Sequence, residues 1–203
     1  MEIYSHYEDV YIDSGDIEFL LMDRLDSLEI NRILSAYEMA EMICSSKLTP
    51  FGMNSFNHAT RVCYILIDEL NIFEPEMICA ALLHDVFNLT NDITPEIIDF
   101  NFGAYTTYLI QCITDSHTLC QKYENPDENT NLQSQVCNDD YLLILGAEHL
   151  DTIRCFDIDV TGNVLKYLEE ISKTLIPLFD NSQNQSLIYL KTELLKHRNK
   201  ILG

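Results

Sequence analysis

Apolar residues recur at steps of three and four along almost the whole chain. Such spacing gathers apolar side chains on one face of an α-helix, whereas a half-buried strand would alternate at every second residue. We find no such alternation, no hairpin signal and no internal repeat. We therefore predict an all-α fold of about eight helices in one compact domain. The helical patterns lie within residues 16–30, 30–46, 58–70, 75–87, 95–103, 103–117, 141–157, 162–180 and 182–202.

Local signals divide the chain further. Residues 1–30 are acidic and predict an N-terminal extension, and residues 31–203 predict the helical domain. Thr94 precedes Pro95 and suits the N-cap of the following helix, which Gly103 is suited to end. Residues 119–140 are polar and lack a regular period, which predicts a long mobile loop.

Composition limits the compartment and the partners. The formal net charge of −21 repels nucleic-acid backbones and anionic membranes, so we expect neither as a partner. No apolar run approaches the roughly 18 residues of a membrane span, and the N-terminus lacks the pattern of a signal peptide. The seven cysteines are odd in number and form no C-x-x-C pair, so buried thiols are expected. These features predict a cytoplasmic protein.

The stretch "AALLHDVF" places His84 and Asp85 at the end of an apolar helical run. Burying an ionised Asp beside a His is costly unless both find partners. A metal ion would supply them, and so would private hydrogen bonds. His58 lies 26 residues upstream, at the start of another helix, and the stretch "GAEHLDTIR" adds Glu148 and Asp151. Two imidazoles and carboxylates from three helices suit Mn²⁺, Fe²⁺, Zn²⁺ or Mg²⁺.

The order of these motifs resembles the HD superfamily of metal-dependent phosphohydrolases. Within it, the chain is most similar to the hydrolase domains of RelA/SpoT-type (p)ppGpp enzymes and to small alarmone hydrolases. "AALLHDV" is followed by "TPEIIDFNFGAYTTYLIQCITDSHTL", which resembles the family's "T-x-x-x-I-x-x-x-F-G" and "V-T-D". "LLILGAEHLDTIR" resembles the family's "K-L-A-D-R-x-x-N-L-R".

The resemblance implies the compact helical HD-domain fold and a divalent metal, with Mn²⁺ expected first and Fe²⁺ or Zn²⁺ as alternatives. The implied metal ligands are His58, His84, Asp85 and Glu148, although the family has Asp at the last position. The alternative is that His84 and Asp85 pair with each other and that Glu148 is solvated.

The chain departs from the family beyond the metal ligands. Asn88 and Leu89 stand where the family has the Glu–Asp pair that activates water, and neither can accept a proton. Asp92 is the nearby carboxylate that could replace the lost base. The residues expected to contact substrate are Lys47, Tyr105, Tyr108, Asp151 and Thr152, the last at the family's Asn position.

Two functions of different classes follow. The first is a divergent nucleotide (pyro)phosphohydrolase related to the (p)ppGpp hydrolases. The second is a catalytically inactive pseudo-hydrolase that acts as a binding or regulatory protein. The loss of the Glu–Asp pair favours the second, and the retained His58, His84 and Asp85 favour the first. The segment 119–140 carries five acidic residues against Lys122 alone, which favours contact with a basic protein partner over capture of a polyphosphate.

Overall fold

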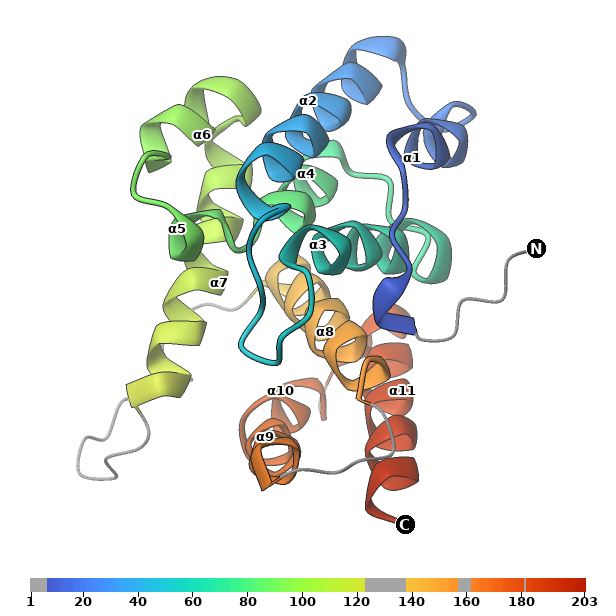
Figure 1. Ribbon diagram of the computed structural model, residues 1–203. Helices are drawn as coiled ribbons and strands as arrows, with labels where there is room; N and C mark the ends of the chain where they lie inside the picture. Colours follow the sequence, from blue (N-terminus) through green and yellow to red (C-terminus); the bar gives the residue numbers. More distant parts are fainter. Residues whose placement is uncertain (1–6, 123–137, 157–161, 181) are drawn as a thin grey trace.

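The computed structural model describes residues 7–122, 138–156, 162–180 and 182–203, and within these ranges the regular elements are helical (Figure 1). The predicted all-α fold is confirmed. The elements in chain order are η1 (Tyr7–Asp9), α1 (Ser14–Leu21), α2 (Ser27–Cys44), α3 (Ser55–Tyr64), η2 (Ile65–Glu69), α4 (Pro75–Leu83), α5 (Val86–Leu89), α6 (Pro95–Phe102), α7 (Ala104–Lys122), α8 (Asp139–Arg154), α9 (Gly162–Thr174), α10 (Ile176–Phe179) and α11 (Gln185–Leu202).

Several helix ends differ from the sequence-based expectation. The pattern in residues 16–30 is divided between α1 and α2, because Asp26 and Glu29 form a capping box that starts α2. The boundary expected at residue 31 falls inside α2, and Ile17 and Leu21 of α1 belong to the same core as α2. The helix α7 continues to Lys122 and α8 begins at Asp139, so residues 119–122 and 139–140 of the expected loop are helical. Its residues 123–137 lie outside the described part of the chain.

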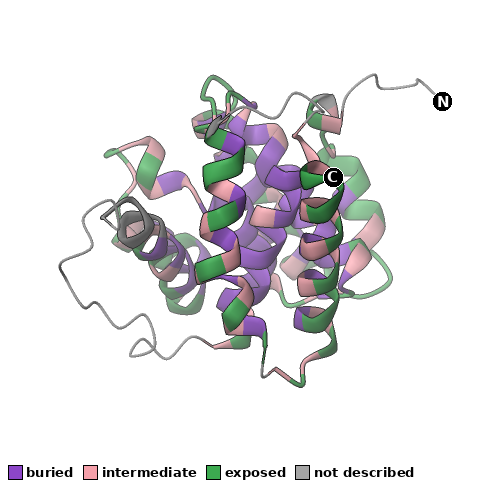
Figure 2. Cartoon of the chain, turned by 90° about the horizontal axis from the view of Figure 1, so that it is seen from below, coloured by how far each residue is buried: buried purple, intermediate pink, exposed green. Residues whose placement is uncertain are grey.

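The core is built around α3, α4 and α8. The helix α4 packs against α2, α3 and α7, and its residues Met77 to Leu83 are all buried. The helix α8 packs against α3 on one side and α11 on the other, with buried residues along almost its whole length. Figure 2 shows this arrangement as buried segments at the centre, surrounded by helices with exposed outer faces. The ends of α3 and α4 are therefore held from several directions.

The helix α3 does not end at Tyr64 but continues into a π-helical turn, η2. There the Leu70 N–H donates to the Ile65 carbonyl, five residues earlier. The turn carries Glu69, which forms a bidentate ion pair with Arg154 of α8 at 2.5 and 2.9 Å. Tyr189 of α11 also donates to Glu69, at 2.7 Å. These contacts join the extension of α3 to α8 and α11.

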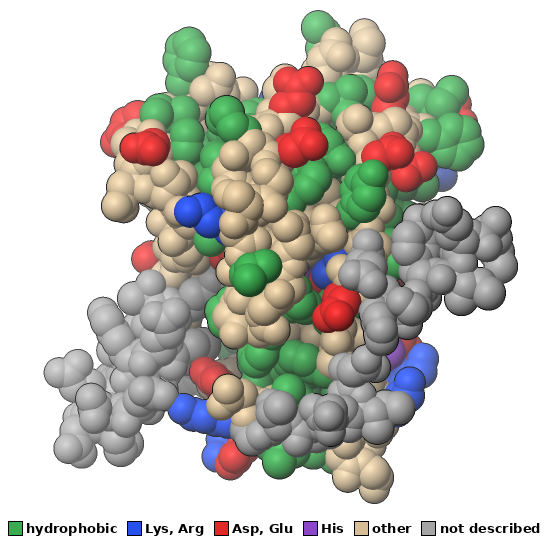
Figure 3. Space-filling model, viewed as in Figure 1, with side chains coloured by type: hydrophobic (Ala, Val, Ile, Leu, Met, Phe, Trp, Pro, Cys, Tyr) green, Lys and Arg blue, Asp and Glu red, His purple; other side chains and the backbone are tan. Residues whose placement is uncertain are grey.

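Acidic side chains are spread over the upper part of the face drawn in Figure 3, around α1, α2 and α6. Large apolar side chains are exposed among them, including Phe19 of α1 and Phe100 of α6. None of the described helices is both long and apolar enough to cross a bilayer.

Close packing of α8 against α11 depends on Gly146. A Cβ atom at this position would lie 2.9 Å from Leu190 Cδ1 and 3.1 Å from Phe179 Cζ. Real carbon atoms do not approach so closely, so a larger residue requires Leu190 or Phe179 to move. Leu190 is fully buried and Phe179 is 1% exposed, which leaves little room for that movement.

We predict that Gly146→Ala destabilises the protein by about 1–2 kcal/mol, because overpacking exceeds the gain in helix propensity. Chemical denaturation of the variant measures the change. The same substitution in a Leu190→Ala background should cost less, because the closest contacting atom is gone. A Gly146→Ala variant more stable than the parent would contradict the close approach of α8 and α11.

Candidate metal centre

His58 and His84 are brought together by the packing of α3 against α4. Asn54 caps α3 by accepting from the Phe56 and Asn57 N–H groups, which sets His58 in the first turn. His84 and Asp85 lie where α4 ends and α5 begins. The two imidazole rings meet edge to face with centroids 5.2 Å apart. One ligand atom each from His58, His84 and Asp85 lie within 4.8 Å of one another, a spacing at which the three could hold a metal ion.

His84 turns its Nε2 atom toward this cluster. The Nδ1–H donates to the Ala81 carbonyl at 2.7 Å, because a carbonyl can only accept. The Nε2 atom is buried and has no hydrogen-bond partner among the described residues. It lies 3.5 Å from Asp85 Oδ2, too far for a good hydrogen bond. A buried nitrogen without a hydrogen bond is costly, and a metal ion at this point would satisfy it.

The charges around His84 also favour a cation. Burial lowers the pKa of His84, but the carboxylates of Asp85 and Glu148 outweigh that effect and raise it to about 9. The same two carboxylates that stabilise a proton on His84 would stabilise a divalent ion in its place.

His58 is oriented from its other side. Its Nδ1 lies 2.7 Å from Asp151 Oδ2. Because Asp151 is also bound by the Arg61 guanidinium, the carboxylate is ionised and accepts, and the His58 Nδ1–H donates. The Nε2 atom is therefore the nitrogen that His58 can offer to a metal. The contacts of Asp151 lie with His58, Arg61 and Tyr7, and its side chain is fully buried.

Glu148 and Thr152 lie on the buried side of α8. Glu148 is not one of the three residues whose ligand atoms lie within 4.8 Å, although its charge acts on His84. The Thr152 hydroxyl donates to the Glu148 carbonyl at 3.0 Å. Both residues are thus held in the helix that faces the two histidines, since α8 packs on α3 and α4.

Asn88, Leu89 and Asp92, which the sequence analysis considered for water activation, follow Asp85 in the chain. The Asn88 amide donates to Asp85 Oδ1 at 3.2 Å. Leu89 is partly buried and packs against the apolar core. Asp92 is exposed in the bend after α5, and its N–H donates to the Thr90 hydroxyl at 3.1 Å.

The other residues expected to bind substrate are exposed. Lys47 lies in the turn between α2 and α3, where its carbonyl accepts from the Ser55 N–H at 3.0 Å. Tyr105 and Tyr108 stack on each other in the first turns of α7, with centroids 6.1 Å apart. The Tyr105 hydroxyl is bound to Asp140 at the start of α8, at 2.6 Å.

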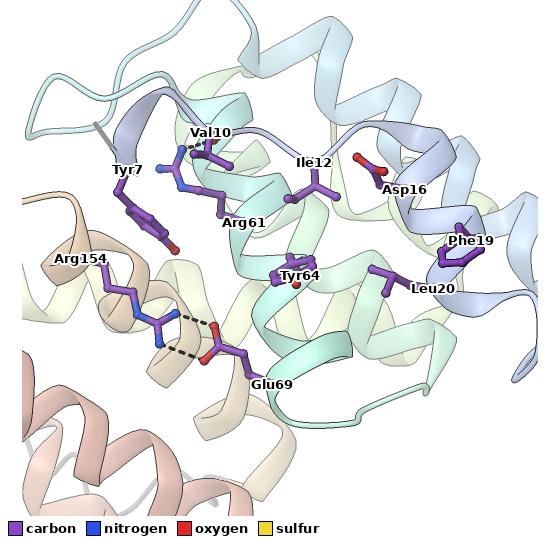
Figure 4. A pocket seen from close by; sticks show the side chains of 10 residues that line it. All are labelled: Tyr7, Val10, Ile12, Asp16, Phe19, Leu20, Arg61, Tyr64, Glu69 and Arg154. Carbon is purple, nitrogen blue, oxygen red and sulfur yellow. Dashed lines mark hydrogen bonds and ion pairs between the residues drawn. The ribbon is translucent and has the colours of Figure 1, made fainter. Parts of the chain in front are cut away.

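The sequence did not single out Arg61 or Tyr7, which both contact Asp151. A signal existed for Arg61, because it follows His58 by one helical turn in a helix otherwise rich in apolar residues. No sequence pattern marks Tyr7. The two residues also line a cavity of about 420 Å³ between the N-terminal segment and α3 (Figure 4). None of the three clustered ligands lines that cavity.

Comparison with known proteins shows similarity in sequence over part of the chain and in fold over most of it. No protein-family model matches the chain. Over 70 residues, 34% of this chain, it is 37% identical to the guanosine-3′,5′-bis(diphosphate) 3′-pyrophosphohydrolase MESH1 of Homo sapiens and 40% identical to that of Danio rerio. The match spans 38% of the length of each of these relatives.

The fold comparison extends over most of the molecule. The chain is similar to the solved structure of a metazoan ortholog of SpoT that hydrolyses ppGpp, with a TM-score of 0.63 and 19% identity. The superposition covers 83% of this chain and 94% of that one. The resemblance indicated by the sequence motifs is thus confirmed: the chain is similar to (p)ppGpp hydrolases in about a third of its sequence and has their all-α fold.

Proposed function

We propose that the protein is a divergent, metal-dependent nucleotide (pyro)phosphohydrolase of the HD type. The observation that carries this proposal is the cluster of His58, His84 and Asp85, with a buried His84 nitrogen that has no hydrogen-bond partner in the described part of the chain. The relatives named above hydrolyse a guanosine bis(diphosphate), which supports a nucleotide as the substrate.

We assign the metal to His58, His84, Asp85 and Glu148. Two imidazoles and two carboxylates suit Mn²⁺ first, with Fe²⁺ or Zn²⁺ as alternatives. Glu148 is the buried carboxylate of α8 whose charge already acts on His84. When bound, a divalent ion polarises a phosphoryl oxygen and lowers the pKa of a bound water.

The residues that follow the proposed ligands are poorly suited to activate an attacking water. The Asn88 amide donates to Asp85 and so orients that ligand, but an amide cannot take a proton at neutral pH. Leu89 is apolar. We assign the role of base to Asp92, the exposed carboxylate of the same segment. A base in an exposed bend is poorly fixed, so slow turnover is expected.

The cations near the centre limit the charge of the substrate. Arg61 is bound to Asp151, and Arg154 is bound to Glu69. Lys47 is exposed and available to a phosphate. Tyr105 and Tyr108 form the exposed aromatic surface that we assign to a base, whereas Asp151 and Thr152 are buried and are not assigned to the substrate. A bis-pyrophosphate needs several cations to balance its charge. We therefore propose a nucleotide that carries fewer phosphates than (p)ppGpp.

A second candidate is an inactive pseudo-hydrolase that binds a nucleotide or a basic protein. The observation in its favour is the position of Asn88 and Leu89, which leaves no proton acceptor directly after the metal ligands. The acidic surface in Figure 3 suits a basic partner. Metal binding is common to both candidates, and turnover separates them.

Metal loading tests the assigned ligands. After incubation with Mn²⁺ and removal of the excess, we expect one metal ion per chain by elemental analysis. His84→Ala should abolish binding, because it removes one of few protein ligands. The matched control is His197→Ala, which removes a histidine that pairs with Glu193 on α11. A parent protein without stoichiometric metal would refute the assignment.

The rate of ppGpp hydrolysis tests the loss of the general base. Hydrolysis of ppGpp should be at least ~10²-fold slower than that of human MESH1 measured alongside, the lower end of the effect of losing a general base. Asn88→Glu combined with Leu89→Asp should raise the rate. The gain should disappear when His84→Ala is added, which controls for activity unrelated to the metal. A parent rate equal to that of MESH1 would contradict the loss of the base.

A further inference from the structure

The N-terminal segment 7–12, here called the N-terminal strap, lies along α3 and is bound to it at several points. The Ile12 N–H donates to the Thr60 hydroxyl at 3.2 Å. The Tyr37 hydroxyl of α2 donates to the Ile12 carbonyl, also at 3.2 Å. Figure 4 shows the strap passing over Arg61, which points from α3 toward it. The strap is therefore fixed to the helix that carries His58.

Arg61 joins the strap to α8. Its Nη1 donates to the carbonyls of Glu8 and Val10, at 2.9 and 2.7 Å. Its Nε and Nη2 donate to the two oxygens of Asp151, at 2.8 and 3.0 Å. The guanidinium also lies over the Tyr7 ring, 5.3 Å from its centroid. The side chain is 2% exposed, so this cation is desolvated. Its oxygen partners come from the strap and from Asp151, and its Nη2 also lies 3.3 Å from the Cys155 Sγ.

Asp151, which Arg61 and Tyr7 hold in place, is bound in turn to His58. Its Oδ1 accepts from the Tyr7 hydroxyl at 3.0 Å and from Arg61, and its Oδ2 accepts from His58 Nδ1 at 2.7 Å. The Arg61 guanidinium donates to both oxygens of this carboxylate, which keeps it an acceptor toward His58. An ionised carboxylate in this position fixes the proton of His58 on Nδ1 and fixes the plane of the ring.

We propose that the N-terminal strap is part of the metal centre, and that Tyr7 and Arg61 are positioning residues that hold Asp151 so that His58 presents Nε2 to the metal. The inference rests on the proposed function, because His58 is taken as a ligand. The alternative is that the network only stabilises the fold. In that case, changes in the strap would lower the stability of the protein but would alter neither the His58 tautomer nor the metal affinity.

The experiment compares Tyr7→Phe with Tyr11→Phe in the full chain. Both variants remove one hydroxyl from the strap, but Tyr11 is 54% exposed. Direct partners of metal-bound histidines typically contribute 10- to 100-fold to metal affinity, so we expect a smaller loss, about 3- to 10-fold in the Mn²⁺ dissociation constant, for Tyr7→Phe. Tyr11→Phe should leave the constant unchanged. Nitrogen NMR of His58 in the metal-free protein should show an Nδ1-protonated ring in the parent and a mixture of tautomers in Tyr7→Phe.

A second variant removes the network as a unit. Arg61→Met with Asp151→Leu replaces a buried ion pair by apolar side chains, an exchange that folded proteins often tolerate. We expect it to stay folded, to lose the single His58 tautomer and to weaken Mn²⁺ binding by about 10- to 100-fold. Either variant is sufficient if the other does not fold.

The outcomes are separable from those of the proposed function. A parent protein that binds no Mn²⁺ overturns the proposed function, and the His58 tautomer in the metal-free protein then decides the positioning role alone. A parent with mixed His58 tautomers overturns the inference. So do variants that keep both the parent tautomer and the parent affinity, because the strap would then only stabilise the fold.

Discussion

The buried carboxylate of Asp151 is the charge on which the centre of the molecule depends. It lies on α8 and binds His58 and Arg61 of α3 and Tyr7 of the N-terminal strap. An ionised group without these partners would be strongly unfavourable in the core, and loss of one partner of such a pair typically costs about 3–5 kcal/mol. The three segments are therefore tied together at one point. Asp151 is in direct contact with His58, which belongs to the cluster of His58, His84 and Asp85.

Much of the fold could be predicted from the sequence because helices leave a periodic pattern. Thr94 and Gly103 mark the ends of α6 as expected, with Gly103 at a positive φ of 94°. The break between α1 and α2 was missed, although Asp26 and Glu29 have the spacing of a capping box. The extension of α7 was not predicted for a different reason: beyond residue 117 the sequence passes into a stretch rich in polar residues that has no regular apolar period.

The site was predictable to the extent that it depends on spacing between helices. The motif "HD" and the upstream His58 indicated a shared site, and the structure brings these three residues together. The contacts of Asp151 could not be foreseen in the same way. Asp151 lies three residues after Glu148, so the two residues share a side of α8. The sequence alone does not show that Arg61 and His58 donate hydrogen bonds to the Asp151 carboxylate. Pairing of a cation and an anion 90 residues apart leaves no local pattern.

The same interactions bear on the charge that the centre can accept. A phosphate close to an unbalanced carboxylate is repelled by about 1 kcal/mol at 4 Å even in bulk water. The chain has 12 basic residues against 33 acidic ones, and Arg61 and Arg154 already balance Asp151 and Glu69. Releasing Arg61 to a substrate phosphate would leave Asp151 buried without its main counterion and would free His58 to rotate. Holding His58 in place as the proposed metal ligand and capturing a polyphosphate would therefore compete for the same cation. Because Arg61 is 2% exposed, the fold favours the first use, and under the proposed function the positive charge that meets a substrate would come mainly from the metal.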